Sequence, residues 1–228
     1  MGSVLIPTKK YREIFPDDFS PETWPGDVQV IDNEQYKQFT RDKWHAKELD
    51  DKISGGFYEG DTDYISISGN IEQKKRKRSL IHELTHKVAT SPDVFSKPLD
   101  ANEIFEDTNK LKIENGYPEI PRKVLDRQRQ LYKSQAEWSG LGIDKTMANE
   151  SLAYKAQLFP KQMYNEPKTW YEKEFKNEFD KYNTRRRIFN PSLAEIELPR
   201  LEDDEMFYKP TKRKSSRLYE LEESFFDQ

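Results

Sequence analysis

The chain contains the sequence His-Glu-x-x-His, in which His82 and His86 are four residues apart. On a helix, this spacing places both imidazoles on one face, one turn apart, so that both can reach one zinc ion at about 2.0–2.1 Å. Glu83, adjacent to the first histidine, is then positioned to hold a metal-coordinated water molecule and to accept its proton. Apolar flanking residues indicate a largely buried helix whose histidines line a cleft: Leu80, Ile81, Leu84, Val88 and Ala89.

The composition favours this interpretation of the pattern. The chain has only three histidines, and two of them occupy it. There is no cysteine, so a metal ion would be bound through nitrogen and oxygen atoms alone. The alternative is a buried helix whose two histidines form hydrogen bonds with their neighbours, since so short a pattern also arises by chance.

Glu150 is the residue that we expect to supply the third metal ligand. It lies in a predicted helix over residues 147–159, 64 residues after His86, which suits a second helix packed against the first. Small neighbours, which are Ala148, Ser151 and Ala153, let two helices approach closely enough for a carboxylate to reach a metal ion. The alternative role is a glutamate at the surface or at a helix end. The competing ligand candidates are Glu137, His45, Glu103, Glu106 and Asp107.

Residues 64–69 predict a half-buried strand, because Ile65 and Ile67 alternate with more polar side chains. A strand directly before a catalytic helix can pair through its free edge with an extended peptide. Backbone hydrogen bonds would then align a peptide substrate across the metal ion, whatever side chains the peptide carries. Further short strands are predicted at residues 27–31 and from residue 57.

We expect an α+β fold, in which a small mixed sheet lies beside the His-Glu-x-x-His helix and a second helix carries the third ligand. Residues 1–26, with four prolines, predict an extended N-terminal arm. Residues 27–190 form the predicted catalytic domain, mostly helical in its C-terminal part, and residues 191–228 a charged tail. Helices are predicted at 33–49, near 100–112, at 122–137, at 147–159 and through much of 161–189.

The overall composition argues against several classes of function. A net charge of -4 gives no general case for nucleic-acid binding. The sequence contains no run of about 18 apolar residues, so it predicts no membrane span. The N-terminus also lacks the apolar segment that is typical of a signal peptide. We therefore expect a cytoplasmic protein, or one that is exported by a route without a signal peptide, for example into a host cell.

Five consecutive basic residues, at positions 74–78, precede the His-Glu-x-x-His pattern. They fit a nucleic-acid contact, a solvated face, or attraction of an acidic substrate to the cleft. We favour the latter two, because nothing basic or aromatic elsewhere extends the patch. Ser79 is a candidate N-cap of the catalytic helix, and the basic run would then lie in a loop or an earlier turn.

Residues 80–89, followed by Asn-Glu-Ser-Leu-Ala at 149–153 and preceded by the strand at about 64–70, resemble the glutamate-liganded zincin metallopeptidases, or gluzincins. This resemblance implies one zinc ion bound by His82, His86 and Glu150, and an edge strand that aligns the substrate. The short catalytic core is similar to bacterial toxin and effector metallopeptidases, including the lethal-factor-like group.

The sequence departs from the lethal-factor-like enzymes at one functional position. These enzymes have a tyrosine seven residues before the ligand glutamate, whereas this chain has Ile143. That departure leaves open which group stabilises the oxyanion. Tyr154, one helical turn after Glu150, is the first candidate for this catalytic role, and Tyr132 and Tyr64 are the others.

Together, these residues predict a zinc-dependent endopeptidase that hydrolyses a protein or peptide substrate. Glu83 would accept a proton from the zinc-activated water molecule and pass it to the leaving amine. The alternative is a catalytically inactive binding or regulatory module on the same scaffold, in which the metal ion is structural or absent.

Overall fold

The structure is a computed structural model of the chain. It describes residues 28–31, 56–59, 64–68, 73–90, 93–133, 136–137 and 140–189. The predicted N-terminal arm, the predicted helix at 33–49 with His45, and the predicted tail at 191–228 lie outside the described residues. All the helices and strands given below fall within the predicted catalytic domain.

The described strands form a three-stranded mixed sheet with the order β1-β3-β2. β1 (Val28–Ile31) runs parallel to β3 (Tyr64–Ser68), and β2 (Gly56–Glu59) runs antiparallel to β3. The predicted strands are therefore confirmed, and so is a small mixed sheet. The prediction that residues 64–69 offer a free edge is wrong, because β3 is the central strand and β2 lies at an edge of the described sheet.

The His-Glu-x-x-His pattern lies on α3 (Gln73–Ala89). This helix begins six residues before Ser79, so the prediction that Ser79 caps it is wrong, and the basic run at 74–78 occupies its first turns. Lysine and arginine are good helix formers, and no glycine or proline interrupts them. Burial anchors the second half of the helix through side chains that are 0–1% exposed: Leu80, Ile81, Leu84 and Val88.

Two helices with different start signals follow α3. α4 (Ala101–Glu114) begins after Asp100, whose carboxylate accepts hydrogen bonds from the backbone N–H groups two and three residues further on. α5 (Arg122–Leu131) begins directly after Pro121. The helix predicted over residues 122–137 is interrupted by a turn at Tyr132, because residues 133 and 136–137 are again helical. Tyr132 forms the C-cap of α5 and packs against an apolar cluster between α4, α5 and α7.

α7 (Ile143–Leu158), which carries Glu150, begins four residues earlier than predicted. It starts directly after Gly142, whose φ of 79° is a conformation that glycine adopts without strain. Pro160 then stands in the first turn of a short helix, α8 (Pro160–Tyr164), where a proline is tolerated. The last described helix is α9 (Trp170–Phe189).

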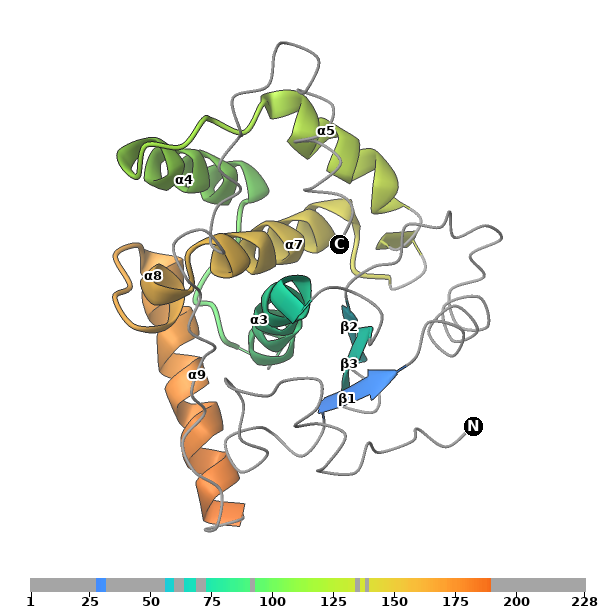
Figure 1. Cartoon of the computed structure of the whole chain (residues 1–228), viewed down its shortest axis with the longest axis vertical. Helices are drawn as coiled ribbons and strands as arrows, with labels where there is room; N and C mark the ends of the chain where they lie inside the picture. The colour runs from blue at the N-terminus through green and yellow to red at the C-terminus, as the bar shows by residue number, and fades with distance from the viewer. Residues whose placement is uncertain are drawn as a thin grey trace.

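These elements are stacked in layers, with α7 near the middle (Figure 1). α3 packs between the sheet and α7, while α4 and α5 contact α7 from its other side. α9 packs against α8 and α3. The main core lies where α3, α7, α9 and the sheet meet, and its members include Ile65, Ile67, Leu80, Leu84, Leu152, Ala156, Tyr164, Tyr171 and Phe175.

A buried polar network joins α7 to the helices on both sides of it. The Nζ atom of Lys155 lies 2.7 Å from Oε1 of Glu172 on α9, and both side chains are almost fully buried. Lys155 also donates a hydrogen bond of 2.5 Å to the hydroxyl of Tyr171. That hydroxyl in turn donates to Asp107 on α4, over 2.8 Å. A buried lysine is tolerated here because its charge has an oxygen partner on either side.

The first prediction concerns this network. Glu172→Gln should lower the free energy of unfolding by about 3–5 kcal/mol, because it leaves the Lys155 ammonium buried without its counter-charge. Urea denaturation measures the loss. Asp180→Asn is the control, because it breaks the exposed pair that Lys176 forms with Asp180 over 2.6 Å, and it should cost less than about 1 kcal/mol. Equal small losses in the two variants would contradict the assigned role.

Candidate metal centre

The packing of α3 against α7 brings three metal-ligating side chains together. The Nε2 atoms of His82 and His86 are 3.1 Å apart. Oε2 of Glu150 lies 3.4 Å from His82 Nε2, and Oε1 of Glu150 lies 3.5 Å from His86 Nε2. A small residue on α7 leaves room for this approach, since Ala153, three residues after Glu150 and so on a neighbouring part of the same helix face, is fully buried. Ala148 instead packs in the cluster between α4, α5 and α7. Among the described residues, this is the one group of three or more ligating side chains that could hold a metal ion.

The distances between the ligand atoms fit a bound metal ion. Four ligand atoms placed tetrahedrally at about 2.0–2.1 Å from zinc lie about 3.3 Å from one another. The three distances of 3.1, 3.4 and 3.5 Å scatter around that value. A charge-assisted hydrogen bond from an imidazolium to a carboxylate would be about 2.7–2.9 Å, clearly shorter than both contacts with Glu150. Two nitrogens and a carboxylate suit zinc and other first-row divalent ions.

Charge balance favours the ionised form of the carboxylate and a cation beside it. Burial alone would raise the pKa of Glu150, but His86 and His82 outweigh burial and hold this pKa far below its usual range. Burial likewise lowers the pKa of His86, and the Glu150 carboxylate more than reverses this effect, raising it to about 8. The buried carboxylate therefore stays charged and requires a positive partner, which is either a proton on histidine or a metal ion.

Glu83 lies beside this group on α3, with 6% of its surface exposed. Burial raises the pKa of its carboxyl above the usual range, although the two histidines of the group act in the opposite direction. The backbone N–H of Tyr58 on β2 donates a hydrogen bond to the Glu83 carboxylate. A buried carboxylate with a raised pKa, fixed by a backbone donor, is suited to accepting a proton at neutral pH.

The edge strand β2 approaches Glu83 closely because Gly56 has no side chain. A Cβ atom built on Gly56 would lie 2.8 Å from the backbone oxygen of Ser66, 2.8 Å from Cδ1 of Ile67 and 3.3 Å from Cγ of Glu83. Neither this contact nor the role of β2 was predicted from the sequence, because both depend on how strands distant in the sequence pair.

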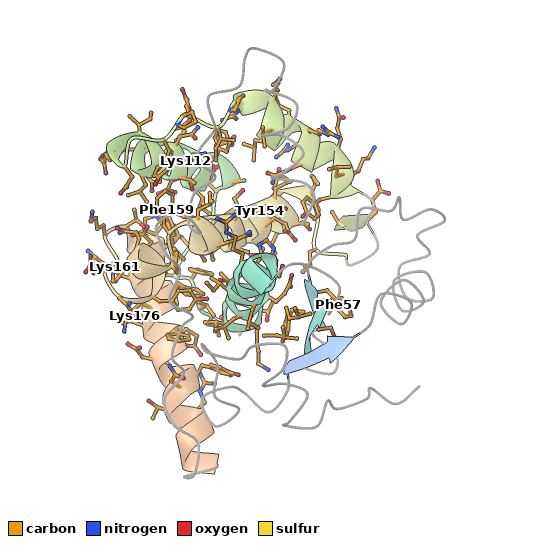
Figure 2. The ribbon with its side chains drawn as sticks, in the orientation of Figure 1. Phe57, Lys112, Tyr154, Phe159, Lys161 and Lys176 are labelled. Atoms are coloured by element: carbon orange, nitrogen blue, oxygen red, sulfur yellow. The ribbon has the colours of Figure 1, made fainter. Side chains whose placement is uncertain are left out.

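Two of the three predicted tyrosines lie at the candidate metal centre. The ring of Tyr154 meets the ring of His82 edge to face, with centroids 4.8 Å apart, and Figure 2 places Tyr154 where α7 passes over α3. Its hydroxyl lies 3.3 Å from the hydroxyl of Tyr132. Burial raises the pKa of both hydroxyls, which therefore remain protonated. Of Tyr64, the structure describes only the backbone, in β3.

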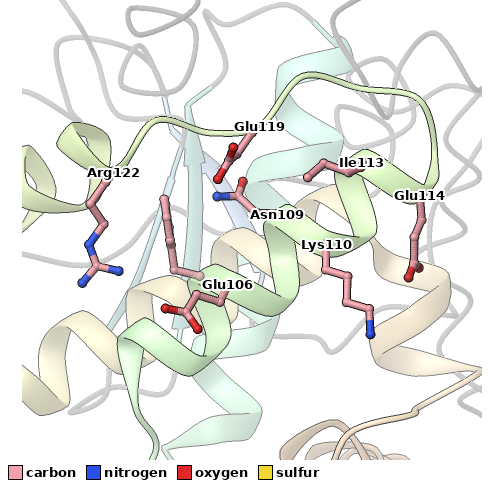
Figure 3. Close-up of a pocket in the computed structure, with 8 residues that line it drawn as sticks. Glu106, Asn109, Lys110, Ile113, Glu114, Glu119 and Arg122 are labelled. Atoms are coloured by element: carbon pink, nitrogen blue, oxygen red, sulfur yellow. The ribbon is translucent and has the colours of Figure 1, made fainter.

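The other ligand candidates on described residues lie elsewhere. Glu137 is exposed and does not belong to the group. Glu103 accepts a hydrogen bond of 2.8 Å from the Trp170 indole, and Asp107 belongs to the buried polar network. Glu106 lines a separate hollow of about 460 Å³ on α4, together with Lys110, Ile113, Glu114, Glu119 and Arg122 (Figure 3).

No protein-family model, curated protein or solved structure matches this chain. The function must therefore be argued from the residues and their geometry. Among the described helices, none has the length and apolar composition that a bilayer span requires.

The contact at Gly56 makes a second prediction. Gly56→Ala should lower the free energy of unfolding by about 1–3 kcal/mol, because the new methyl group meets the rigid backbone oxygen of Ser66. It should also displace β2 from Glu83. Urea denaturation measures the first effect and a crystal structure of the variant the second. An alanine accommodated at full stability, with β2 in place, would show that the close approach is not required.

The third prediction concerns the pH dependence of metal binding. A metal ion must displace the proton that His86 carries below its pKa of about 8 in the metal-free protein. Affinity for a divalent ion should therefore fall about tenfold for each pH unit below about 8 and level off above it. Competition with a chelator of known affinity, at several pH values, gives the slope. An affinity that stays constant from about pH 6 to pH 8 would contradict the predicted competition.

Proposed function

We propose that this protein is a zinc-dependent endopeptidase of the glutamate-liganded zincin type. The observation that carries the proposal is the convergence of His82, His86 and Glu150 from two helices, with the buried carboxylate of Glu83 beside them. An ordinary structural metal site has no need of a fourth, non-ligating carboxylate with a raised pKa. A catalytic site needs one to move a proton.

The proposed reaction divides the chemistry between the metal ion and the chain. Zinc bound by such residues supplies Lewis acidity and lowers the pKa of a coordinated water molecule towards about 7. Glu83 accepts the proton of the attacking water on a carboxylate oxygen and then donates it to the nitrogen of the leaving amine. The N–H of Tyr58 keeps the carboxylate in place during both transfers.

The edge strand β2 supports a peptide as the substrate. β2 uses one edge to pair with β3, and its Tyr58 backbone also reaches Glu83. An extended peptide that adds to the other edge of β2 would therefore run past the proton-accepting carboxylate. This replaces β3, the strand expected from the sequence, as the substrate-aligning strand.

Tyr154 is the proposed donor to the oxyanion. It lies against His82, and its hydroxyl stays protonated at neutral pH because burial raises its pKa. A protonated hydroxyl beside the reacting carbonyl can donate a hydrogen bond to the negative charge that develops on its oxygen.

The fourth prediction tests the proton transfer. Glu83→Gln should keep the bound zinc ion and reduce cleavage of an unfolded protein mixture by about 100-fold to 10,000-fold, because an amide cannot accept the proton. Zinc content by atomic spectroscopy and peptide release are measured on the same sample. Glu174→Gln, on the outside of α9, is the control and should retain both properties.

Two results would count against this mechanism. Full cleavage by Glu83→Gln would remove Glu83 as the proton acceptor. A wild-type protein that holds zinc but cleaves no peptide would favour the alternative, a binding module on the same scaffold.

A further inference from the structure

Two tyrosine hydroxyls face each other between α5 and α7. The Tyr132 hydroxyl, from the C-cap of α5, lies 3.3 Å from the hydroxyl of Tyr154 on α7. This distance exceeds the roughly 2.8 Å that is typical of two hydroxyls, as hydrogen bonds in catalytic sites commonly do before a substrate binds. The ring of Tyr154 also meets the ring of His82 edge to face, with centroids 4.8 Å apart. The contact therefore joins α5 to the tyrosine that borders the candidate metal centre.

The direction of this hydrogen bond decides what Tyr154 can do. A phenol has one proton to donate, so a bond from Tyr154 to Tyr132 would leave none for a substrate. Burial raises the pKa of both hydroxyls most strongly, but their contact lowers the pKa of Tyr154 and raises that of Tyr132. Accepting a hydrogen bond favours the ionised form of a phenol, and donating one disfavours it. Tyr132 is therefore the donor, and the Tyr154 proton stays available.

Packing and a second polar side chain fix this arrangement on α5. The Tyr132 ring packs against an apolar cluster that includes Met147 on α7, and its backbone N–H donates to the carbonyl of Gln128 over 2.9 Å. The Gln128 side chain lies one turn earlier on the same face of α5 and is 4% exposed. Its Nε2 atom is buried without a hydrogen-bond partner in the part of the chain that the structure describes. The buried face of α5 thus carries two groups that can donate.

From this contact we infer that Tyr132 is a positioning residue, which donates a hydrogen bond to the Tyr154 oxygen and so directs the Tyr154 proton towards the carbonyl of a bound peptide. A hydroxyl proton rotates about its C–O bond, and a donor on one side of the oxygen leaves it the other side. Hydrogen bonds in a chain also strengthen one another, so Tyr154 becomes a better donor. The inference rests on the proposed function, in which Tyr154 stabilises the oxyanion.

A double-mutant cycle tests this role, with kcat measured on a peptide that the wild type cleaves. Tyr132→Phe should reduce kcat about threefold to tenfold, the worth of one hydrogen bond, and leave KM within about twofold. Tyr154→Phe should reduce kcat about 100-fold, as the loss of an oxyanion donor does. The double variant should match Tyr154→Phe within about twofold, because Tyr132 acts only through the missing hydroxyl. The control Tyr117→Phe, whose ring packs against a separate apolar cluster, should keep the wild-type kcat.

Two further measurements separate positioning from a general loss of structure. Zinc affinity, measured by competition with a chelator, should stay within about twofold of wild type in Tyr132→Phe, because its hydroxyl acts on Tyr154 and not on a metal ligand. Affinity for a phosphinic peptide, whose tetrahedral anion resembles the transition state, should weaken by about the same factor as kcat falls. If Tyr132→Phe does not fold, Tyr132→Met also removes the hydroxyl and fills the space with a flexible apolar side chain.

Each outcome supports or overturns the inference. An unchanged kcat in Tyr132→Phe would overturn it, as would losses that multiply in the double variant or a weakened zinc affinity. A larger loss in Tyr132→Phe than in Tyr154→Phe would instead make Tyr132 the tyrosine that faces the substrate. A wild type that binds zinc and the phosphinic peptide without cleaving would refute the peptidase alone, because the same cycle can be run on the affinity for that peptide. A wild type that does not bind the phosphinic peptide would refute both.

Discussion

The contact between α3 and α7 is the constraint on which the rest of the structure depends. α3 supplies two imidazoles and α7 one carboxylate, and the three ligand atoms meet only because the helices approach closely. The small side chain of Ala153 on α7 leaves room for this approach, and Leu80 and Leu84 on α3 stabilise it by burial. The sheet packs against α3 from one side, and α4 and α5 pack against α7 from the other. All these elements therefore help to hold α3 and α7 at a fixed distance from each other.

α7 combines two buried charges that are balanced in different ways. Lys155 is neutralised within the chain by Glu172, and this pair ties α7 to α9. Glu150 instead faces two histidines, which carry positive charge only when they are protonated. A divalent ion balances that carboxylate across the whole pH range in which the histidines are neutral. The first pair therefore stabilises the fold, and the second group is suited to binding an ion.

The parts of the site that local spacing determines were predictable from the sequence. A separation of four residues sets the two histidines on one face of a helix, and small residues around Glu150 indicated a close helix partner. The contacts that depend on the path of the chain were not predictable. The order of the strands placed β2, not β3, at the edge next to Glu83, and the packing of α5 on α7 brought the Tyr132 hydroxyl within 3.3 Å of the Tyr154 hydroxyl. Neither event has a periodic signal, because each joins residues distant in sequence.

The division of the ligands between two helices also matters for the lifetime of the protein. An ion that only the folded chain can hold adds its binding free energy to folding, about 2.7 kcal/mol at a free concentration 100 times the Kd. An ion held by His82, His86 and Glu150 would bridge α3 and α7 and would act as a reversible cross-link through the middle of the molecule. When such an ion is scarce, a larger fraction of chains would open and be exposed to degradation. The abundance of this protein would then follow the supply of the ion in its surroundings.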